Sequence, residues 1–451
     1  MNKEILVEWN PHWNKEAGSK LIERDLLKDI EQWLERKEIL GFIGVRRSGK
    51  TTLMNILISR LTSKIPPKNI LFVKCDDDRV QKENLIDDAI KSYRELINPE
   101  GKIFVFIDEV QEVDNWENTL KRIYDLEKSM KLIISGSNFS MLKEDFSYRL
   151  AGRIAYFEVY PLSFREFLKT KLTIKDRISA FSKKNEIKHH LFEYMELGGF
   201  PEVALENNPG TKKQLLAFYF DTIIYRDIIK KRGIRNAAKM EKMVNLLLQN
   251  ISNPMNFSKV GKDIFLSVDT VGEYAANLKD AYLVFNVPIF SFSVKAQEIN
   301  PKKIYCIDSG IRNIKGFRFS LDYGRIAENI VFIELKRRNF SNPLSRIFYW
   351  HDKNQRETDF LLMNELKIKE ALQVCWDISQ PEVKEREVEG LLSALNKFDL
   401  ESGLIITEDY EGEEIIGDKR ITFIPLWLWL IFPDNTIIQR KNTAVGNAKN
   451  A

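Results

Sequence analysis

The sequence predicts an α/β protein with a parallel sheet in its N-terminal part and a second α/β domain toward its C-terminus. Between residues 31 and 160, short apolar runs with the pattern of buried strands alternate with segments that have the pattern of helices. This alternation is typical of a parallel sheet covered by helices. Between residues 323 and 407 the order changes to helix, three strands, helix and strand. The change of order indicates a separate domain.

The elements of the N-terminal part follow from local patterns. Residues 39–43 are an apolar run of the length of a buried strand, and residues 51–57 begin a helix with apolar residues near helical spacing. Pro66 and Pro67 then break the chain. Later strands are predicted at 70–73, 102–109, 132–138 and 154–159, and later helices at 83–97 and 115–126.

A phosphate-binding pattern lies between the first predicted strand and the helix after it. Residues Gly44-Val45-Arg46-Arg47-Ser48-Gly49-Lys50-Thr51 fit G-x-x-x-x-G-K-[ST]. In such a loop, backbone N–H groups and the helix N-terminus face nucleotide phosphates, and the glycines permit the tight path. We expect Lys50 to reach the β and γ oxygens and the Thr51 hydroxyl to bind Mg²⁺. The predicted nucleotide site comprises the eight motif residues and Thr52.

The third predicted strand ends in two acids, Asp108 and Glu109. Ligands of an open α/β sheet bind beyond the carboxyl ends of its strands, so Asp108 should lie beside the loop and hold Mg²⁺ together with Thr51. Glu109 is then placed to orient or deprotonate the attacking water. An exposed acidic pair that only ends a strand is the alternative.

Further candidates come from the ends of later strands. Ser137 and Asn138, after the fourth strand, could bond the γ-phosphate or the attacking water, and a simple polar turn is the alternative. Arg153 precedes the fifth strand and could stabilise charge on the transferring phosphoryl group, within the chain or across an oligomer interface. Arg149 is a second candidate for that role. The predicted catalytic residues are Glu109, Asn138 and Arg153.

Length and composition set limits on the whole protein. At 451 residues the chain should divide into roughly two to four domains. Its 69 basic and 65 acidic side chains leave a net charge of +4, so binding to DNA would need a local basic patch. Three distant cysteines favour a reducing compartment over a disulfide framework or a zinc site. No apolar run approaches the roughly 18 residues of a membrane helix, so we expect a cytoplasmic protein without a membrane partner.

The densest basic stretch lies within the mainly helical residues 161–249. Residues 226–242 hold seven basic side chains against Asp227 and Glu241. A solvated helix face is one interpretation, and contact with the phosphates of DNA is the other. The basic residues are Arg226, Lys230, Lys231, Arg232, Arg235, Lys239 and Lys242.

The next region predicts a winged helix-turn-helix. The expected parts are a helix at 257–264, a turn at 266–267, a helix at 268–278, and wing strands at 282–292 and 303–307. The second helix carries Asp269 and Glu273 against Lys279, a poor balance for docking on phosphates. Packing or protein contact is therefore favoured over reading of DNA bases.

The C-terminal order of elements matches the core of PD-(D/E)xK nucleases. Such enzymes place an acid on the second strand and acid-x-Lys on the third, because two carboxylates hold Mg²⁺ and the lysine stabilises charge on the attacked phosphate. Asp359 fills the first place, and Glu328 could serve as a helical acid. The third strand has Gln373 and Cys375 where the acid and the lysine are needed. The possible nuclease-like site is therefore Glu328, Asp359 and Gln373.

The altered third strand leaves the chemistry of this domain open. A glutamine can coordinate a metal through its carbonyl oxygen, whereas Cys375 cannot supply a cation. Lys367 or Lys369 could take that role from a few residues upstream. The substitutions favour a degenerate binding or structural module over an active nuclease.

These patterns predict five segments. They are a P-loop domain with an N-terminal lead at 1–160, a helical lid at 161–235, a winged helix-turn-helix at 236–318, a restriction-endonuclease-like domain at 319–435 and a flexible tail at 436–451.

With these motifs, the chain resembles prokaryotic, especially archaeal, AAA-type ATPases that carry a C-terminal nuclease-like domain of unknown function. The resemblance spans about residues 20–432 and implies ATP and Mg²⁺ as cofactors, hydrolysis, and a winged-helix module. It implies no biological role. Besides the loop at 44–51, it rests on Phe106-Ile107-Asp108-Glu109-Val110-Gln111 with Trp116, Ser135-Gly136-Ser137-Asn138, Leu150-Ala151-Gly152-Arg153, Pro161-Leu162-Ser163-Phe164, Gly198-Gly199-Phe200-Pro201-Glu202 and Glu357-Thr358-Asp359-Phe360.

Three functions stay open at this point. The first is a Mg²⁺-dependent ATPase that couples hydrolysis to domain movement, with DNA or a protein as its partner. The second is a nucleotide-gated binding module with little turnover. The third is an ATP-regulated Mg²⁺ nuclease acting on DNA. The sequence does not fix the oligomeric state.

Overall fold

The computed structural model describes residues 1–14, 21–97, 99–137, 150–315, 322–339, 342 and 344–433. The chain forms two compact units. Unit 1 comprises Met1–Leu162 and Asp280–Tyr282, and unit 2 comprises Ser163–Lys279 and Leu283–Ala451. Asn138, Arg149 and the predicted tail at 436–451 lie outside the described residues. The finer division into five segments stays a prediction.

Unit 1 is built on a five-stranded sheet in which all neighbouring strands are parallel, in the order β2-β3-β4-β1-β5. The first four strands in the chain are almost entirely buried, because a parallel sheet is covered on both faces. The predicted α/β fold with a parallel sheet is confirmed. The strands are β1 Ile39–Ile43, β2 Ile70–Lys74, β3 Ile103–Asp108, β4 Met130–Gly136 and β5 Ile154–Glu158.

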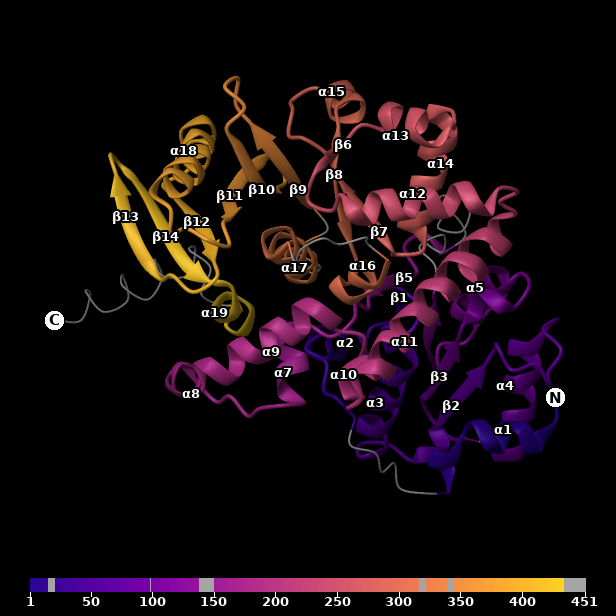
Figure 1. The fold of residues 1–451 in the computed structure, drawn as a ribbon. Helices are drawn as coiled ribbons and strands as arrows, with labels where there is room; N and C mark the ends of the chain where they lie inside the picture. Colours follow the sequence, from indigo (N-terminus) through magenta and orange to yellow (C-terminus); the bar gives the residue numbers. More distant parts are fainter. Residues whose placement is uncertain are drawn as a thin grey trace. The chain divides into compact units, whose positions relative to one another are not determined.

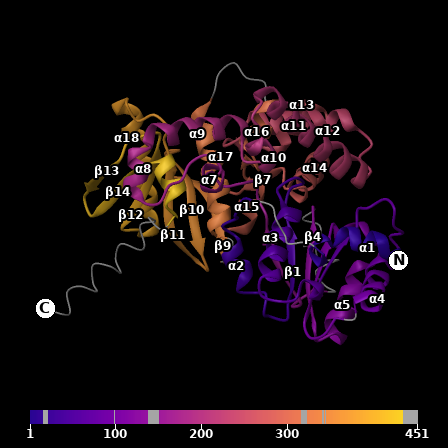
Figure 2. The ribbon, with the colours of Figure 1, turned by 90° about the horizontal axis from the view of Figure 1, so that it is seen from below.

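The helices of unit 1 divide between the two faces of the sheet. They are α1 Lys3–Trp9, α2 Leu27–Glu31, α3 Lys50–Thr62, α4 Leu85–Ile97 and α5 Trp116–Leu126, with short 3₁₀ turns η1 Pro11–Trp13, η2 Pro67–Asn69 and η3 Val110–Glu112. The chain crosses the sheet from β1 to β2 in one direction and returns through β3 to β4. Because such crossovers are right-handed, α3 covers one face and α4 and α5 cover the other (Figure 2).

The parallel register brings the loop after β1 and the acids after β3 to one edge of the sheet. Ile43 pairs with Gly136 on β4, and Ile134 of the same strand pairs with Ile107 on β3. The residue after Ile107 is Asp108, the last residue of β3. The loop and the acid therefore share the carboxyl edge of the sheet, as the sequence predicts.

Unit 2 begins with the predicted helical region. Its first helix starts with a capping box, in which Ser163 Oγ accepts a hydrogen bond from Glu166 N at 3.1 Å and Ser163 N donates one to Glu166 Oε2 at 2.9 Å. The elements are α7 Phe164–Lys169, α8 Arg177–Ser182, α9 Lys184–Leu197, α10 Pro201–Leu205, α11 Pro209–Asp221, the π-helical segment η5 Thr222–Lys230 and α12 Ala237–Gln249.

The region predicted as a winged helix-turn-helix contains helices at both predicted places, Phe257–Ile264 and Val268–Asp280, and a three-stranded antiparallel sheet in the order β6-β8-β7. The strand predicted at 282–292 ends early, at Val287, because Pro288 follows and cannot donate to the ladder. The elements are β6 Pro254–Met255, α13 Phe257–Ile264, α14 Val268–Asp280, β7 Val284–Val287, α15 Val294–Ile299, β8 Lys302–Cys306 and α16 Ser309–Lys315.

The C-terminal part of unit 2 is a mixed six-stranded sheet in the order β13-β14-β12-β11-β10-β9. Helix, three strands, helix and strand follow one another in the predicted order. Helix α18 packs across β10, β11 and β12 over an apolar core that includes Leu361, Leu391 and Ile405 (Figure 1). The elements are α17 Tyr323–Arg338, β9 Ser345–His351, β10 Glu357–Asn364, β11 Lys367–Val374, α18 Pro381–Phe398, β12 Ser402–Thr407, β13 Gly412–Ile416, β14 Lys419–Pro425 and α19 Leu426–Ile431.

Two predictions from composition bear on the described residues. None of the helices in those residues has the length and apolarity needed to cross a membrane. Cys75, Cys306 and Cys375 are buried thiols without disulfide bonds.

Candidate active site

The loop between β1 and α3 has a backbone path that requires glycine at its first motif position. Gly44 has a φ of +150°, and a Cβ atom there would lie 2.2 Å from the carbonyl oxygen of Val159. Val159 N also donates a hydrogen bond to Ile43 O at 2.7 Å, which fixes the end of β1 against the end of β5. Gly49, the N-cap of α3, has a φ of +96°. L-residues with a side chain rarely adopt such angles, so both motif glycines are explained by geometry.

The loop encloses a buried ammonium group and a buried hydroxyl group. Lys50 is 4% exposed, and its Nζ donates hydrogen bonds to the carbonyl oxygens of Gly44 at 3.0 Å and Val45 at 3.1 Å. Ser48 Oγ is buried and has no hydrogen-bond partner within the described part of the chain. Buried hydroxyls normally have partners, so Ser48 marks a position that suits a ligand oxygen. These groups, together with the N-terminus of α3, suit phosphate oxygens.

Two oxygen ligands suited to Mg²⁺ lie side by side next to this loop. Thr51 Oγ1 donates a hydrogen bond to Asp108 Oδ2 at 2.8 Å. Burial raises the pKa of the Asp108 carboxyl, and hydrogen bonds from Ser135 and Thr51 oppose that rise. A bound cation would favour the ionised carboxylate still further. A hydroxyl and a carboxylate are the hard oxygen ligands that Mg²⁺ prefers, so the predicted pair fits the ion.

Ser135, on β4, holds both acids and was missed as a site residue. Its Oγ donates a hydrogen bond to Asp108 Oδ1 and accepts one from Glu109 N at 3.0 Å. Glu109 has a φ of +52°, and Gln111 Nε2 donates a hydrogen bond to its Oε2. The sequence pattern favours Ser137, at the end of the predicted strand, whereas Ser135 lies inside β4 and pairs with Phe42. A hydroxyl directly after the apolar run Leu132-Ile133-Ile134, still inside the strand, was the available signal.

Arg153 does not reach the loop of its own chain. It precedes β5, and its Nε donates a hydrogen bond to Asp125 Oδ1 at 3.1 Å. Its carbonyl oxygen accepts a hydrogen bond at 2.8 Å from Ile39 N, at the start of β1. The nucleotide loop follows the other end of β1, so a role for Arg153 within one chain is wrong. The physical reason is strand direction, because a residue before a parallel strand lies at the edge opposite the ligand.

Arg24 supports the loop from the N-terminal lead, and no local pattern indicated it. This buried arginine donates hydrogen bonds from Nη1 to Ser48 O at 3.0 Å and from Nη2 to Tyr160 O at 2.6 Å. Both acceptors are main-chain groups far from it in the sequence. Arg24 therefore positions the loop, because it joins the loop to the segment after β5.

The residues of the possible nuclease-like site come together in unit 2. Asp359 on β10 and Gln373 on β11 are neighbours, since Asp359 N donates a hydrogen bond to Gln373 Oε1 at 3.0 Å. Lys367 and Lys369 are exposed, and the ammonium group bound to the acids comes instead from Lys303 on β8. The suggestion that Lys367 or Lys369 supplies the cation is wrong, because both point into solvent.

The basic stretch at 226–242 is largely exposed across the end of η5 and the start of α12. Lys239 is half-buried and its Nζ donates a hydrogen bond to Phe265 O. The other six basic residues of the stretch are exposed, namely Arg226, Lys230, Lys231, Arg232, Arg235 and Lys242. The surface position is compatible with both interpretations of this stretch, a solvated face or a phosphate contact.

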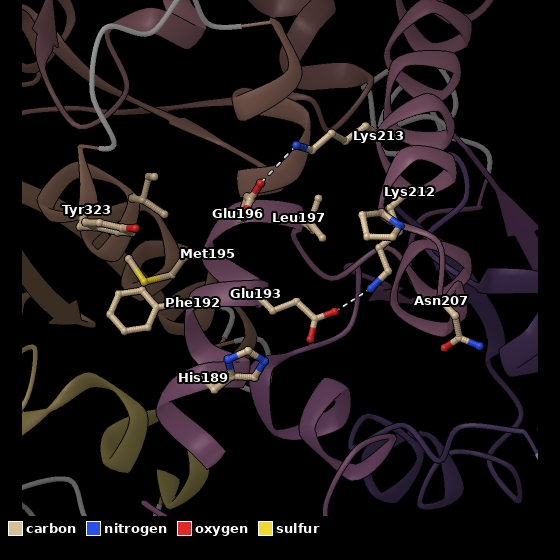
Figure 3. A pocket seen from close by; sticks show the side chains of 12 residues that line it. His189, Phe192, Glu193, Met195, Glu196, Leu197, Asn207, Lys212, Lys213 and Tyr323 are labelled. Atoms are coloured by element: carbon tan, nitrogen blue, oxygen red, sulfur yellow. Dashed lines mark hydrogen bonds and ion pairs between the residues drawn. The ribbon is translucent and has the colours of Figure 1, made fainter. Parts of the chain in front are cut away.

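A separate pocket of about 440 Å³ in unit 2 differs from the loop in its charge balance (Figure 3). It lies between α9, α11 and α17, with Phe192 and Tyr323 on one side. Lys212 Nζ lies 2.6 Å from Glu193 Oε1. Lys213 Nζ lies 3.4 Å from Glu196 Oε1. Each lysine of the pocket is paired with a carboxylate, so the pocket is a poor match for a phosphate-rich ligand.

The family comparisons agree with this geometry. A family model described as an AAA domain matches residues 36–168, which contain the loop and all five strands of the parallel sheet. Unit 1 therefore contains a P-loop domain of AAA type, a class of nucleotide-binding proteins that includes ATPases. Models of two domains of unknown function, DUF8612 and DUF4143, match residues 188–318 and 323–429.

The chain belongs to the family of an uncharacterized protein of Methanocaldococcus jannaschii, MJ1544. The two are 33% identical over 445 residues, which cover 95% of this chain and 96% of that protein. An uncharacterized protein of Haemophilus influenzae is 27% identical over 413 residues, which cover 89% of this chain and 97% of that protein. These relatives extend the similarity over nearly the whole chain.

A solved structure of the Aeropyrum pernix ORC1 protein in complex with DNA is similar to this chain at 10% sequence identity, with a TM-score of 0.30. The match covers 72% of this chain and 97% of that chain.

Proposed function

We propose that unit 1 binds ATP with Mg²⁺ and hydrolyses it, and that the protein couples hydrolysis to movement of its helical and C-terminal parts. The observation that carries this proposal is the hydrogen bond of 2.8 Å between Thr51 Oγ1 and Asp108 Oδ2. It places the two expected Mg²⁺ ligands together, with Glu109 next in the chain. Binding of ATP without hydrolysis would not require an acid at position 109.

Polar residues of the loop and of its surroundings have distinct roles in nucleotide binding. Lys50 exchanges its two main-chain carbonyl partners for phosphate oxygens, and Ser48 gains the partner that its hydroxyl lacks in the described chain. Thr51 and Asp108 would hold Mg²⁺, which neutralises charge that develops on the phosphoryl oxygens. Arg24 would hold the loop in position, since it donates hydrogen bonds to the main chain of Ser48 and of Tyr160.

Glu109 is the proposed base or orienting group for the attacking water. Its main chain is held by Ser135 and its carboxylate by Gln111, so the side chain has a defined position before water arrives. Asn138, as a second group for the water or the γ-phosphate, remains part of the proposal. Arg153 enters only as a residue that acts on a neighbouring copy of the chain.

Steady-state hydrolysis by the Lys50→Ala variant tests the assignment. We expect a loss of roughly 100-fold or more in turnover, because the charge that faces the phosphates is gone. Circular dichroism should show an unchanged fold. Turnover at the wild-type rate in a folded Lys50→Ala protein would contradict the assignment.

The Glu109→Gln variant separates an ATPase from a nucleotide-gated module with little turnover. In an ATPase it should retain bound ATP after gel filtration while hydrolysis falls, because binding persists and water activation is lost. In a slow switch it should change neither quantity. Radiolabelled ATP, recovered as ATP or ADP from the protein peak, distinguishes the two.

DNA is a candidate partner in addition to ATP, and the six exposed basic residues of 226–242 favour it. Replacing Arg226, Lys230 and Lys231 with glutamine should weaken binding to duplex DNA and reduce the slope of log affinity against log salt by about one per lost contact. Hydrolysis with and without DNA completes the test. Equal DNA affinity and slope in the wild type and the variant would leave a protein partner as the proposal.

The nuclease alternative needs the acids of unit 2. Cleavage of DNA that disappears in the Asp359→Ala variant would support it. Intact single- and double-stranded DNA after incubation with the wild-type protein, ATP and Mg²⁺ or Mn²⁺ would count against it.

A further inference from the structure

The acidic cluster of unit 2 surrounds a single buried ammonium group. Lys303 is 1% exposed, and its Nζ lies 2.8 Å from Asp359 Oδ1, 2.9 Å from Glu328 Oε1 and 2.6 Å from Glu357 Oε1. The carboxylates come from α17 and β10, whereas the lysine comes from β8 in the preceding part of the chain. One cation therefore bridges three acids from two other elements.

Further hydrogen bonds from the fold reach the cluster. Asp359 Oδ2 accepts a hydrogen bond from Val374 N at 2.9 Å, and Glu328 Oε1 accepts a second one from Tyr305 Oη at 2.7 Å. Gln373 Oε1 accepts the hydrogen bond from Asp359 N, and Gln373 Nε2 donates to Glu387 Oε2. One oxygen each of Glu328 and Glu357 and both oxygens of Asp359 thus already have N–H, O–H or ammonium donors.

Aromatic rings pack around this ion cluster. Tyr305 stacks on Phe332 with ring centroids 4.2 Å apart, and Lys303 Nζ lies 5.9 Å from the ring centroid of Tyr349. Burial lowers the pKa of Lys303, but the carboxylates of Asp359 and Glu328 outweigh it and hold the pKa well above its ordinary value. The lysine is therefore charged at neutral pH. Burial and the Asp359 carboxylate raise the pKa of Glu328 to about 8, and the ammonium group of Lys303 opposes that rise.

We propose that Lys303 is a built-in cation that takes the place of a divalent metal ion in the acidic cluster of Glu328, Glu357 and Asp359. The ammonium group lies where two carboxylates on the sheet and one on the helix converge, the position that a Mg²⁺ ion would need. Within the described residues, no group of three or more His, Cys, Asp or Glu side chains is arranged to hold a metal ion. The cluster therefore joins β8 to α17 and β10 and excludes metal.

The role of Lys303 belongs to unit 2 alone and does not rest on the proposed ATPase activity. Without Lys303, three carboxylates face one another in a confined space and favour the uptake of a divalent cation. The Lys303→Met variant is suitable because methionine keeps an unbranched apolar stem and removes only the charged end.

Binding of Mn²⁺ without nucleotide, counted by electron paramagnetic resonance of the free ion, tests the proposal. We expect no binding that depends on Asp359 in the wild type, and about one extra Mn²⁺ per chain in Lys303→Met. The extra site should disappear in the Lys303→Met/Asp359→Asn double variant. Mn²⁺ should also raise the thermal midpoint of Lys303→Met by several degrees at roughly 100 times its Kd.

Lys302→Met is the matched control, because Lys302 is the neighbour on β8 and pairs instead with Glu298. It should bind no more Mn²⁺ than the wild type. A wild-type Mn²⁺ site that Asp359→Asn removes would overturn the proposal, whether or not Lys303→Met folds. A folded Lys303→Met protein that gains no site would overturn it as well.

Discussion

The loop of unit 1 and the acidic cluster of unit 2 each contain a buried lysine, but the two lysines have different partners. Lys50 is bonded to neutral main-chain carbonyl oxygens, and Lys303 is bonded to three carboxylates. A phosphate oxygen is a stronger acceptor than a carbonyl oxygen, so a ligand can displace the partners of Lys50. A ligand cannot readily displace three carboxyl groups that the fold itself supplies. The identity of the acceptors thus separates an open site from a closed one.

The largest expected effect comes from removing the charge of each lysine in turn. Lys303→Met should lower the free energy of unfolding of the chain by about 3–5 kcal/mol, because it leaves buried carboxylates without their cation. Lys50→Met should cost about 1 kcal/mol, since the two hydrogen bonds that it removes go to neutral carbonyl oxygens. Urea denaturation followed by tryptophan fluorescence measures both. Equal losses would remove the distinction between the two sites.

The next effect tests how strictly the loop is shaped for its ligand. Gly44→Ala should cost about 1–3 kcal/mol of stability, because its φ of +150° disfavours a side chain and the Cβ would lie against Val159 O. Nucleotide affinity should fall with it, measured by fluorescence of a labelled ATP. Gly101→Ala, also at a positive φ but with open space around it, separates backbone strain from the clash.

A smaller effect is expected at Ser135. Ser135→Ala should reduce hydrolysis about tenfold with the fold retained, because both acids lose the hydroxyl that orients them. Ser137→Ala, directly after the same strand, is the comparison and should have less effect. A larger loss at Ser137 than at Ser135 would return the role to the residue chosen from the sequence.

The smallest effect is a pH dependence in unit 1. Burial lowers the pKa of His12, whose Nε2 lies 3.0 Å from Ile70 O. The folded state therefore binds the proton less well than the unfolded chain does, so stability is complete above the unfolded pKa of about 6.5 and falls as the pH drops below it. His12→Asn should flatten that fall in denaturation midpoints between about pH 7.5 and 5. If the dependence of the denaturation midpoint on pH were unchanged in His12→Asn, the loss of stability at low pH would come from other groups.

What could be predicted from the sequence depended on whether the signal was local. The loop at 44–51 and Asp108 were found because a motif and a strand end specify them, and the parallel sheet then brings them together. The order of the C-terminal elements was also readable, since each strand and helix has its own periodicity. The role of Arg153 within one chain did not follow from the motif, because strand direction decides which edge of the sheet the residue occupies.

Contacts between segments far apart in the chain have no local sequence pattern that predicts them. Arg24 acts on Ser48 and Tyr160, and Lys303 acts on residues up to 56 positions away. Lys303 lies in the short strand β8, where a lysine is expected at an exposed edge rather than inside. Only the packing of β8 against α17 places its ammonium group among the acids.

The ion cluster also determines where the chain can be cut. The two domain models of unit 2 meet near residue 320, which assigns Lys303 to one and its three carboxylate partners to the other. A C-terminal fragment that begins at residue 323 would carry the acids without their counter-charge. The shortest fragment of this region with balanced charges therefore begins before β8, so the boundary of the folding unit does not coincide with the boundary of sequence similarity.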